Sequence, residues 1–106
     1  MFGRQVTLKL KANSATELNR IATDEILPIL RKQKGFRDET TFVAPERLEA
    51  IANSFWDTKA DAEAYSHTAY AEVLKTLSNV IDGTPTVKNF EFASSTIQPL
   101  AASKLV

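Results

Sequence analysis

Five side chains between positions 53 and 70 carry groups that could bind a ligand or react with it. His67 is the sole histidine of the chain. Because an imidazole has an unperturbed pKa of about 6.5, it is the natural proton shuttle near neutral pH. Asn53, Trp56, Tyr65 and Tyr70 supply an amide, an indole N–H and two hydroxyls, which are all hydrogen-bonding groups. These residues are the first candidates for a site.

Each of these residues also has a structural interpretation. An asparagine on a strand is typically a surface or edge residue, and a tryptophan that ends a strand packs against the following helix. His67 lies four residues after Glu63, which favours a half-exposed histidine beside that carboxylate. Tyr70 falls in an apolar helical stripe. Tyr65 would project away from that stripe, unless the helix breaks near Thr68 and changes phase.

Composition predicts one globular domain. The chain has 106 residues, of which 43% are hydrophobic, enough for a single core. Basic and acidic residues are equal at 13 each, which argues against binding to nucleic acid or to an anionic membrane. The absence of cysteine and the single histidine argue against disulfides and against a metal site. The sequence has neither a signal-peptide pattern nor an apolar run of membrane length, so we expect a cytoplasmic protein.

Hydrophobic periodicity predicts the elements that position the candidate residues. Alternation with period two predicts a strand over 4–11, and threonine and aromatic content predicts one over 37–43. Residues 48–56 are expected to form a third strand or a strand with a bulge, and residues 86–93 the last strand. Helical spacing predicts helices over 14–34 and 58–81, with a kink at Pro28 in the first. The second helix is expected to end at Asp82-Gly83-Thr84-Pro85. We expect a domain at residues 1–93 and a C-terminal arm at residues 94–106.

The element order βαββαβ predicts an α+β, ferredoxin-like fold. Such a fold has a four-stranded antiparallel sheet with two helices on one face. The other face would be uncovered, and it carries Ile51 and Phe55, or Phe90 and Phe92, among polar residues. An exposed face of this kind is a candidate surface for a partner or a ligand, so we expect a homodimer formed through it.

The segment from Asn53 to Tyr65, NSFWDTKADAEAY, resembles the antibiotic biosynthesis monooxygenase (ABM) family. The likeness rests on a tryptophan that ends the third strand, an acidic residue after it, and a helix that opens on Thr58 with acidic and alanine positions. Gly35-Phe36 also matches, and the order of elements is similar over residues 4–93. The resemblance implies a dimeric α/β barrel, in which two ferredoxin-like sheets face each other and enclose a pocket in each subunit.

Some members of that family oxidise polycyclic phenols or quinols with O2 and without a cofactor. Their task is to bind the phenol, stabilise its anion and exclude water. By this resemblance the catalytic residues would be Asn53 and Trp56. His67 is added as the candidate base because an imidazole titrates near neutral pH. The substrate-binding residues would be Phe55, Tyr65 and Tyr70, although Tyr65 and Tyr70 occupy positions where many quinol-oxidising relatives have histidine. No cofactor and no metal are expected.

Haem-cleaving members of the family are a poorer match. They resemble one another by a helix aromatic and a histidine ten residues later, and Tyr65 could serve as the aromatic. Lys75 stands at the later position, and a protonated lysine does not ligate haem iron. Their first-strand asparagine has no counterpart among Gln5, Thr7 and Lys9. Haem cleavage is therefore disfavoured.

Two functions follow from the sequence. The first is a cofactor-independent monooxygenase that acts on a phenolic or quinol-type small molecule. The alternative is a non-catalytic dimeric barrel that binds a small hydrophobic ligand or has a structural role. Asn53 and Trp56 favour the enzyme, whereas the missing histidines at positions 65 and 70 favour the alternative. RNA binding would require a basic Gly-aromatic motif on the third strand, which residues 48–55 lack.

Overall fold

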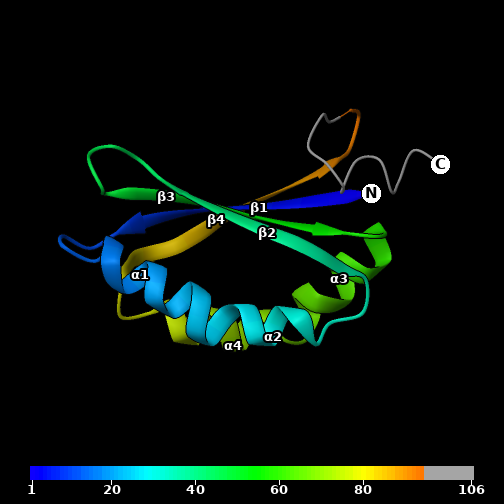
Figure 1. The fold of residues 1–106 in the computed structure, drawn as a ribbon, viewed down its shortest axis with the longest axis horizontal. Helices are drawn as coiled ribbons and strands as arrows, with labels where there is room; N and C mark the ends of the chain where they lie inside the picture. The colour runs from blue at the N-terminus through cyan, green and yellow to red at the C-terminus, as the bar shows by residue number, and fades with distance from the viewer. Residues whose placement is uncertain (95–106) are drawn as a thin grey trace.

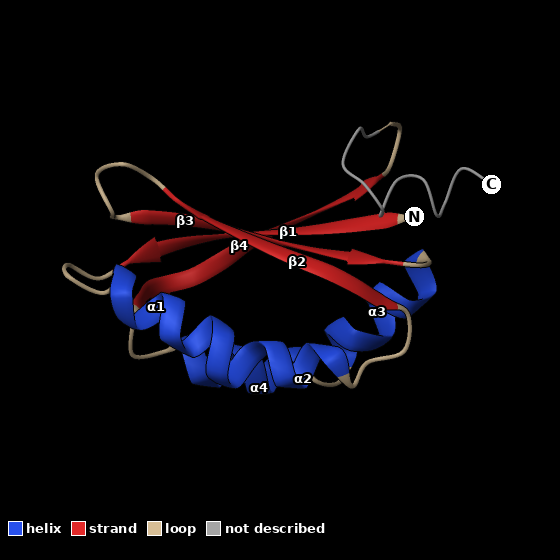
Figure 2. Cartoon of the chain, in the orientation of Figure 1, coloured by secondary structure: helices blue, strands red, loops and turns tan. Residues whose placement is uncertain are grey.

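A computed structural model describes residues 1–94, so the expected arm at residues 94–106 lies outside these described residues except for its first residue. The expected α+β, ferredoxin-like fold is confirmed, with each helical region divided into shorter segments (Figures 1 and 2). The elements in chain order are β1 (Phe2–Leu10), α1 (Ala15–Ile21), the π-helical segment η1 (Ala22–Ile26), α2 (Leu27–Arg31), β2 (Phe36–Val43), β3 (Glu49–Trp56), α3 (Lys59–His67), α4 (Tyr70–Leu77) and β4 (Ile81–Glu91).

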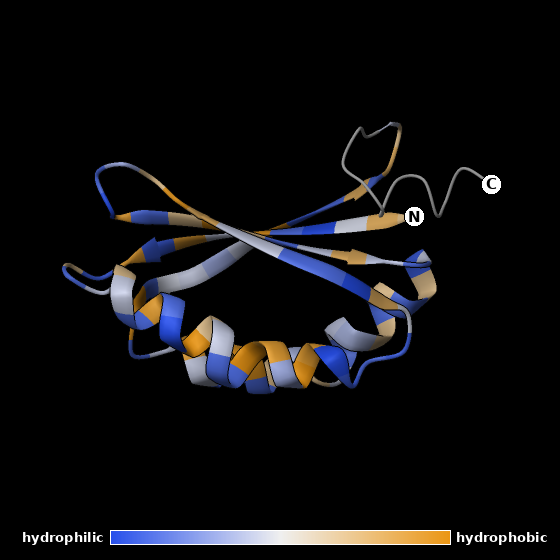
Figure 3. Cartoon of the chain, viewed as in Figure 1, coloured by the Kyte–Doolittle hydropathy of each residue, from blue (hydrophilic) through white to orange (hydrophobic). Residues whose placement is uncertain are grey.

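The four strands form one antiparallel sheet in the order β2-β3-β1-β4. The helices lie together below one face of this sheet, and apolar bands recur along the helical layer (Figures 1 and 3). Side chains alternate between the two faces of a strand. In β1, for example, Leu8 and Leu10 are buried on the helix-covered face, whereas Lys9 between them is exposed. This face carries the core of the protein.

The core centres on Trp56, Leu8 and Leu18, which are at most 2% exposed. They come from β3, β1 and α1, so the core joins the middle of the sheet to the helical layer. Burying each large apolar side chain stabilises the fold by about 1.5–3 kcal/mol relative to exposing it. Apolar packing therefore holds the two central strands against the helices without any contribution from polar groups.

The first helical region is irregular where the sequence predicts a kink. Pro28 lies in the first turn of α2 and lacks the N–H that would continue the hydrogen-bond ladder. The chain adopts a π-helical turn, η1, immediately before it. Wider turns of this kind accommodate an interrupted ladder and often occur beside functional sites. The irregularity expected at Pro28 is present, and it takes the form of this π-helical segment.

The second helical region is divided, contrary to the expectation of one helix over 58–81. Thr68 leaves the helical conformation, with φ −122° and ψ −83°, and its hydroxyl donates to the Ala64 carbonyl at 2.7 Å. α4 then ends at Leu77, and Ile81 already pairs with Leu10 as the start of β4. The expected start of this strand at residue 86 was wrong, because a bulge opposite β1 absorbs the Gly-Pro segment that resembles a helix stop.

Gly35 offers a test of how closely α3 packs against the turn before β2. Its φ is +79°, and a Cβ there would overlap the Asp61 side chain, lying 2.7 Å from the Asp61 Cβ. Gly83 has a φ of +70°, but its Cβ would meet nothing within 4 Å. Both alanine variants force an L-residue into the left-handed region at about 1–2 kcal/mol. We expect Gly35→Ala to lower the free energy of unfolding by at least about 1 kcal/mol more than Gly83→Ala in urea denaturation. Equal losses would contradict the packing described.

Candidate functional site

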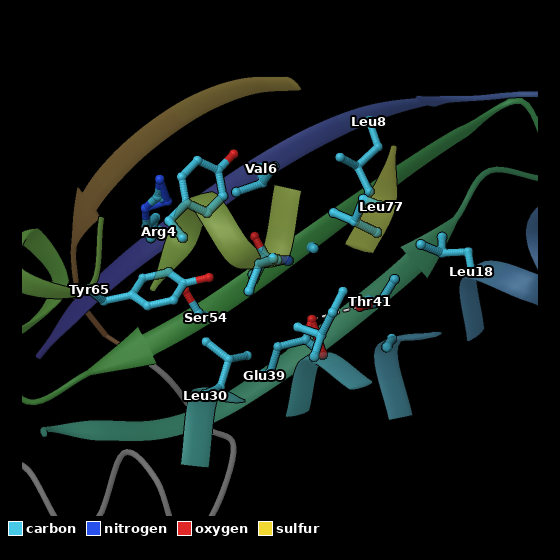
Figure 4. A pocket seen from close by; sticks show the side chains of 16 residues that line it. Arg4, Val6, Leu8, Leu18, Leu30, Glu39, Thr41, Ser54, Tyr65 and Leu77 are labelled. Carbon is cyan, nitrogen blue, oxygen red and sulfur yellow. Dashed lines mark hydrogen bonds between the residues drawn. The ribbon is translucent and has the colours of Figure 1, made fainter. Parts of the chain in front are cut away.

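A pocket lies between the sheet and the helical layer, within a single chain (Figure 4). Its walls are mostly aliphatic side chains of β1, α1, η1, α2 and α4. The polar groups come from the three adjacent strands β2, β3 and β1 and from α3 and α4: Arg4, Glu39, Thr41, Ser54, Tyr65 and Tyr70. This pocket is on the helix-covered face of the sheet, whereas a pocket enclosed by two facing sheets would lie on the uncovered face. An apolar cavity with a few convergent polar groups is the usual form of a small-molecule site.

Arg4 is the dominant charge of the pocket. It is 5% exposed, and its Nη1 atom is buried without a hydrogen-bond partner. Its guanidinium carbon lies 4.0 Å from the centre of the Tyr70 ring and 5.5 Å from that of Tyr65. Burial lowers the pKa of Arg4, but an arginine remains protonated in proteins. The pocket therefore contains a fixed positive charge with an unused donor.

Tyr65 faces the pocket because Trp56 lies behind it. The two rings stack with centroids 5.0 Å apart and planes at 27°, and Phe36 meets the indole edge-on at 5.6 Å. The indole N–H donates to the Ser54 Oγ at 2.9 Å. Burial raises the pKa of Tyr65 well above its usual range, and the Arg4 charge opposes this only in part. Tyr65 thus offers a neutral hydroxyl at neutral pH.

Glu39 brings a carboxylate to the same pocket from β2. A register shift between Phe36 and Asp38 turns Glu39 to the helix-covered face, opposite Ser54 of β3. The Thr41 hydroxyl donates to its Oε2 at 2.7 Å. The pKa of Glu39 is raised mainly by burial, while the Thr41 hydrogen bond lowers it and the neighbouring Asp38 raises it further. This carboxylate holds its proton more readily than a solvated one.

The predicted catalytic trio is not brought together. Asn53 and Trp56 are three positions apart on one strand, so their side chains belong to opposite faces. Asn53 borders the pocket, but its side chain accepts a hydrogen bond of 3.3 Å from Gln5, its partner on β1. Trp56 is fully buried, and its N–H is already used by Ser54. His67 is exposed near the end of α3 and does not line the pocket.

The predicted substrate-binding residues divide in the same way. Tyr65 and Tyr70 both line the pocket, because the break at Thr68 turns α3 relative to α4. Tyr65 is 5% exposed, which agrees with the alternative of a break near Thr68 and not with the outward projection expected of a continuous helix. Phe55 lies on the uncovered face, where its ring meets Phe92 edge-on at 5.4 Å.

Four polar residues of the pocket were missed in the sequence, namely Thr41 and Ser54 and the two charged residues, Arg4 and Glu39. Arg4 has the same strand parity as Val6, Leu8 and Leu10, so a charge on the apolar face of the first strand was a usable signal. Glu39 gave no such signal, because simple alternation along β2 is interrupted by the register shift. In residues 1–94, no cluster of three or more metal-ligating side chains is found, and no helix is long and apolar enough to span a membrane.

The fold is the ferredoxin-like α+β fold that is also seen in structures named as monooxygenases. A monooxygenase from the ActVA-Orf6 gene of Streptomyces coelicolor, in complex with nanaomycin D, superposes with a TM-score of 0.76 at 16% identity, covering 92% of each chain. SnoaB, a cofactor-independent oxygenase from Streptomyces nogalater, gives a TM-score of 0.70 at 12% identity over 90% of this chain and 95% of its own.

A third structure, from Deinococcus radiodurans, is named provisionally as an antibiotic biosynthesis monooxygenase. It gives a TM-score of 0.69 at 16% identity, covering 92% of this chain and 97% of its own. No protein-family model matches the sequence, and a comparison with curated proteins finds no significant match. At these identities the likeness shows a common fold, and the expected resemblance to ABM proteins is confirmed at that level.

Arg4→Met tests whether the buried guanidinium serves a ligand or the fold. Methionine keeps much of the apolar stem and removes both the charge and the unpartnered donor, whose burial costs about 1–3 kcal/mol. Lost contacts with the tyrosine rings offset part of this gain. We expect the free energy of unfolding in urea to stay equal or to rise by about 1 kcal/mol. The exposed Arg20→Met is the matched control. A loss above about 2 kcal/mol would show that Arg4 serves the fold instead.

Proposed function

We propose that this chain is a cofactor-independent monooxygenase that acts on a phenolic or quinol-type small molecule. The observation that carries the proposal is the buried, unpartnered Nη1 of Arg4 in a pocket that is otherwise mainly apolar. An aromatic ring with an anionic oxygen matches such a site, because the ring fits the aliphatic walls and the oxygen accepts from the guanidinium. The names of the Streptomyces structures with the same fold support this choice of chemistry.

Arg4 would act by stabilising the substrate anion. A phenolate is electron-rich and reacts with O2 more readily than the neutral phenol does. In a pocket of low dielectric, a preorganised guanidinium stabilises such an anion far more than it would in water. For a substrate with a methylene group conjugated to the phenolate ring, one oxygen atom becomes a carbonyl. The other oxygen leaves as water with the two methylene hydrogens, so the substrate supplies all the electrons. For a hydroquinone, one oxygen atom enters a ring C–H bond, and the other leaves as water with the two hydrogens that the ring loses on becoming a hydroxyquinone.

The size of the pocket favours a single-ring substrate for the first assays. The cavity measures about 50 Å³, whereas a cavity of about 150 Å³ holds benzene. A ligand must therefore displace the walls. Two of the segments that line the pocket are irregular, namely η1 and the region around Tyr70 after the helix break. A small hydroquinone requires less displacement than a polycyclic phenol.

A non-catalytic binding protein is the second candidate. It is favoured by the position of His67, because the one imidazole of the chain is exposed and outside the pocket. In this case Arg4, Tyr65 and Tyr70 would bind an aromatic anion without turning it over. Binding with no consumption of O2 distinguishes this candidate from the enzyme.

The protein is also proposed to form a homodimer through the uncovered face of its sheet. Phe42 and Phe90 are 64% and 51% exposed on that face, where Phe55 and Phe92 form an aromatic pair. Exposed apolar side chains gathered on one face indicate an interface. A second copy matches this surface because a twofold axis would set the same apolar residues against each other.

Oxygen uptake tests the proposed enzyme. With a panel of hydroquinones and anthrones, we expect the protein to consume O2 faster than buffer does. Arg4→Met should lower this rate by about 10²-fold, because one preorganised donor to a developing anion contributes about that factor. Arg20→Met, on the exposed surface of α1, should keep the rate. Rates equal to buffer across the panel would exclude the oxygenase.

Sedimentation tests the dimer. We expect a dimer at micromolar concentration, and Phe42→Ser with Phe90→Ser should shift it to monomer by removing apolar area from the uncovered face. Leu48→Ser is the matched control, since Leu48 is 52% exposed but sits in the turn before β3. A native protein that sediments as a stable monomer would rule out the shared barrel.

A further inference from the structure

A single row of paired residues crosses three strands beneath the pocket. Ser54 on the middle strand, β3, pairs with Arg4 of β1 on one side and with Glu39 of β2 on the other. All three line the pocket, and Figure 4 shows Arg4 and Glu39 on different strands around it. Adjacent strands lie about 4.8 Å apart, so the two charged residues start from backbones about 10 Å apart. The row places a cation and a carboxylate on either side of Ser54.

The two charges are separate in the described structure. The ion pairs found within residues 1–94 do not include Arg4 or Glu39. Arg4 retains an unused donor at Nη1, while one oxygen of Glu39, Oε2, is held by Thr41. A ligand could therefore supply two things: an acceptor for the guanidinium and a proton for the carboxylate. A hydroxyl group on an aromatic ring supplies both.

We propose that Glu39 is the base of this pocket and that it takes the proton from a hydroxyaromatic ligand held between Glu39 and Arg4. The ligand O–H bond breaks, an O–H bond forms on the Glu39 carboxylate, and the electron pair stays on the ligand oxygen. The negative charge then faces Arg4. The inference rests on the proposed function, because it assigns the proton acceptor for the same substrate class. Glu39 also fills the role for which His67 is badly placed.

The surroundings of Glu39 suit a base. The other ionisable groups lining the pocket are Arg4 from β1, Tyr65 from α3 and Tyr70 from α4, while α1, η1 and α2 contribute only apolar residues. Asp38 precedes it on β2 and adds like charge. Burial raises its pKa, which brings the carboxyl group nearer to the acidity of a phenol and makes it the stronger base. The Thr41 hydrogen bond holds the side chain in place.

Proton accounting with 4-nitrophenol tests the proposal. The anion of this probe is yellow, so absorbance reports ionisation, and calorimetry in buffers of different ionisation enthalpy reports protons released. With the native protein, below the pKa of the free probe, we expect bound anion with almost no proton released, because Glu39 keeps the proton. Glu39→Gln, which preserves the shape and an acceptor for Thr41, should release about one proton per bound anion. The exposed Glu49→Gln should behave as the native protein does.

The outcomes separate the two proposals. Equal proton release by the native protein and Glu39→Gln, or a neutral bound probe, would overturn the role of Glu39 alone. Absence of binding, or binding that survives Arg4→Met unchanged, would overturn the proposed site and the base with it.

With a hydroquinone that is turned over, Glu39→Gln should lower kcat by about 10²-fold. Thr41→Val should move the acidic limb of the pH profile upward, because it removes a hydrogen bond that lowers the pKa of Glu39. A limb that stays in place would contradict the assignment.

Discussion

The site depends on a positive charge that the fold buries without a hydrogen-bonding acceptor at Arg4 Nη1. Desolvating a guanidinium is unfavourable, and the faces of Tyr65 and Tyr70 offset only part of that cost. A guanidinium buried in this way persists only if the packing of the surrounding core compensates for the remaining cost. Here β1 is one of the two central strands and is bonded to both β3 and β4, so the sheet fixes the backbone from which the Arg4 side chain extends.

The tyrosine rings reach Arg4 through a local break in the helix. A continuous helix would turn Tyr65 away from the apolar stripe, but the non-helical Thr68 resets the phase. Trp56 then stacks on Tyr65, and its N–H is satisfied by Ser54 of the same strand. Trp56 thus holds the Tyr65 ring in place. The centre of the Tyr65 ring that it supports lies 5.5 Å from the guanidinium carbon of Arg4. Trp56 itself does not line the pocket, and its N–H is bonded to Ser54.

Much of the fold could be predicted from sequence, because it follows from periodic apolar residues. Alternation along residues 4–11 and 48–56 specified the two central strands and their buried face. The site was less accessible, since it depends on exceptions to periodicity: the break at Thr68, and the register shift that turns Glu39 inward. Arg4 could have been found from its parity with Val6 and Leu8. Asn53 and Trp56 could have been separated by the same rule, being an odd number of positions apart on one strand.

The alternation of side chains along the strands also separates the residues of the pocket from those of the uncovered face. Arg4, Ser54 and Glu39 form a row on the helix-covered face, whereas the paired Gln5 and Asn53 form the next row on the opposite face. A substitution in the first row therefore changes the lining of the pocket, and a substitution in the second changes the uncovered surface of the sheet. Proteins with 12–16% identity share this backbone without having to share the occupants of either row. The chemistry must be argued from the row itself, in which Arg4 and Glu39 lie on either side of Ser54 without forming an ion pair with each other.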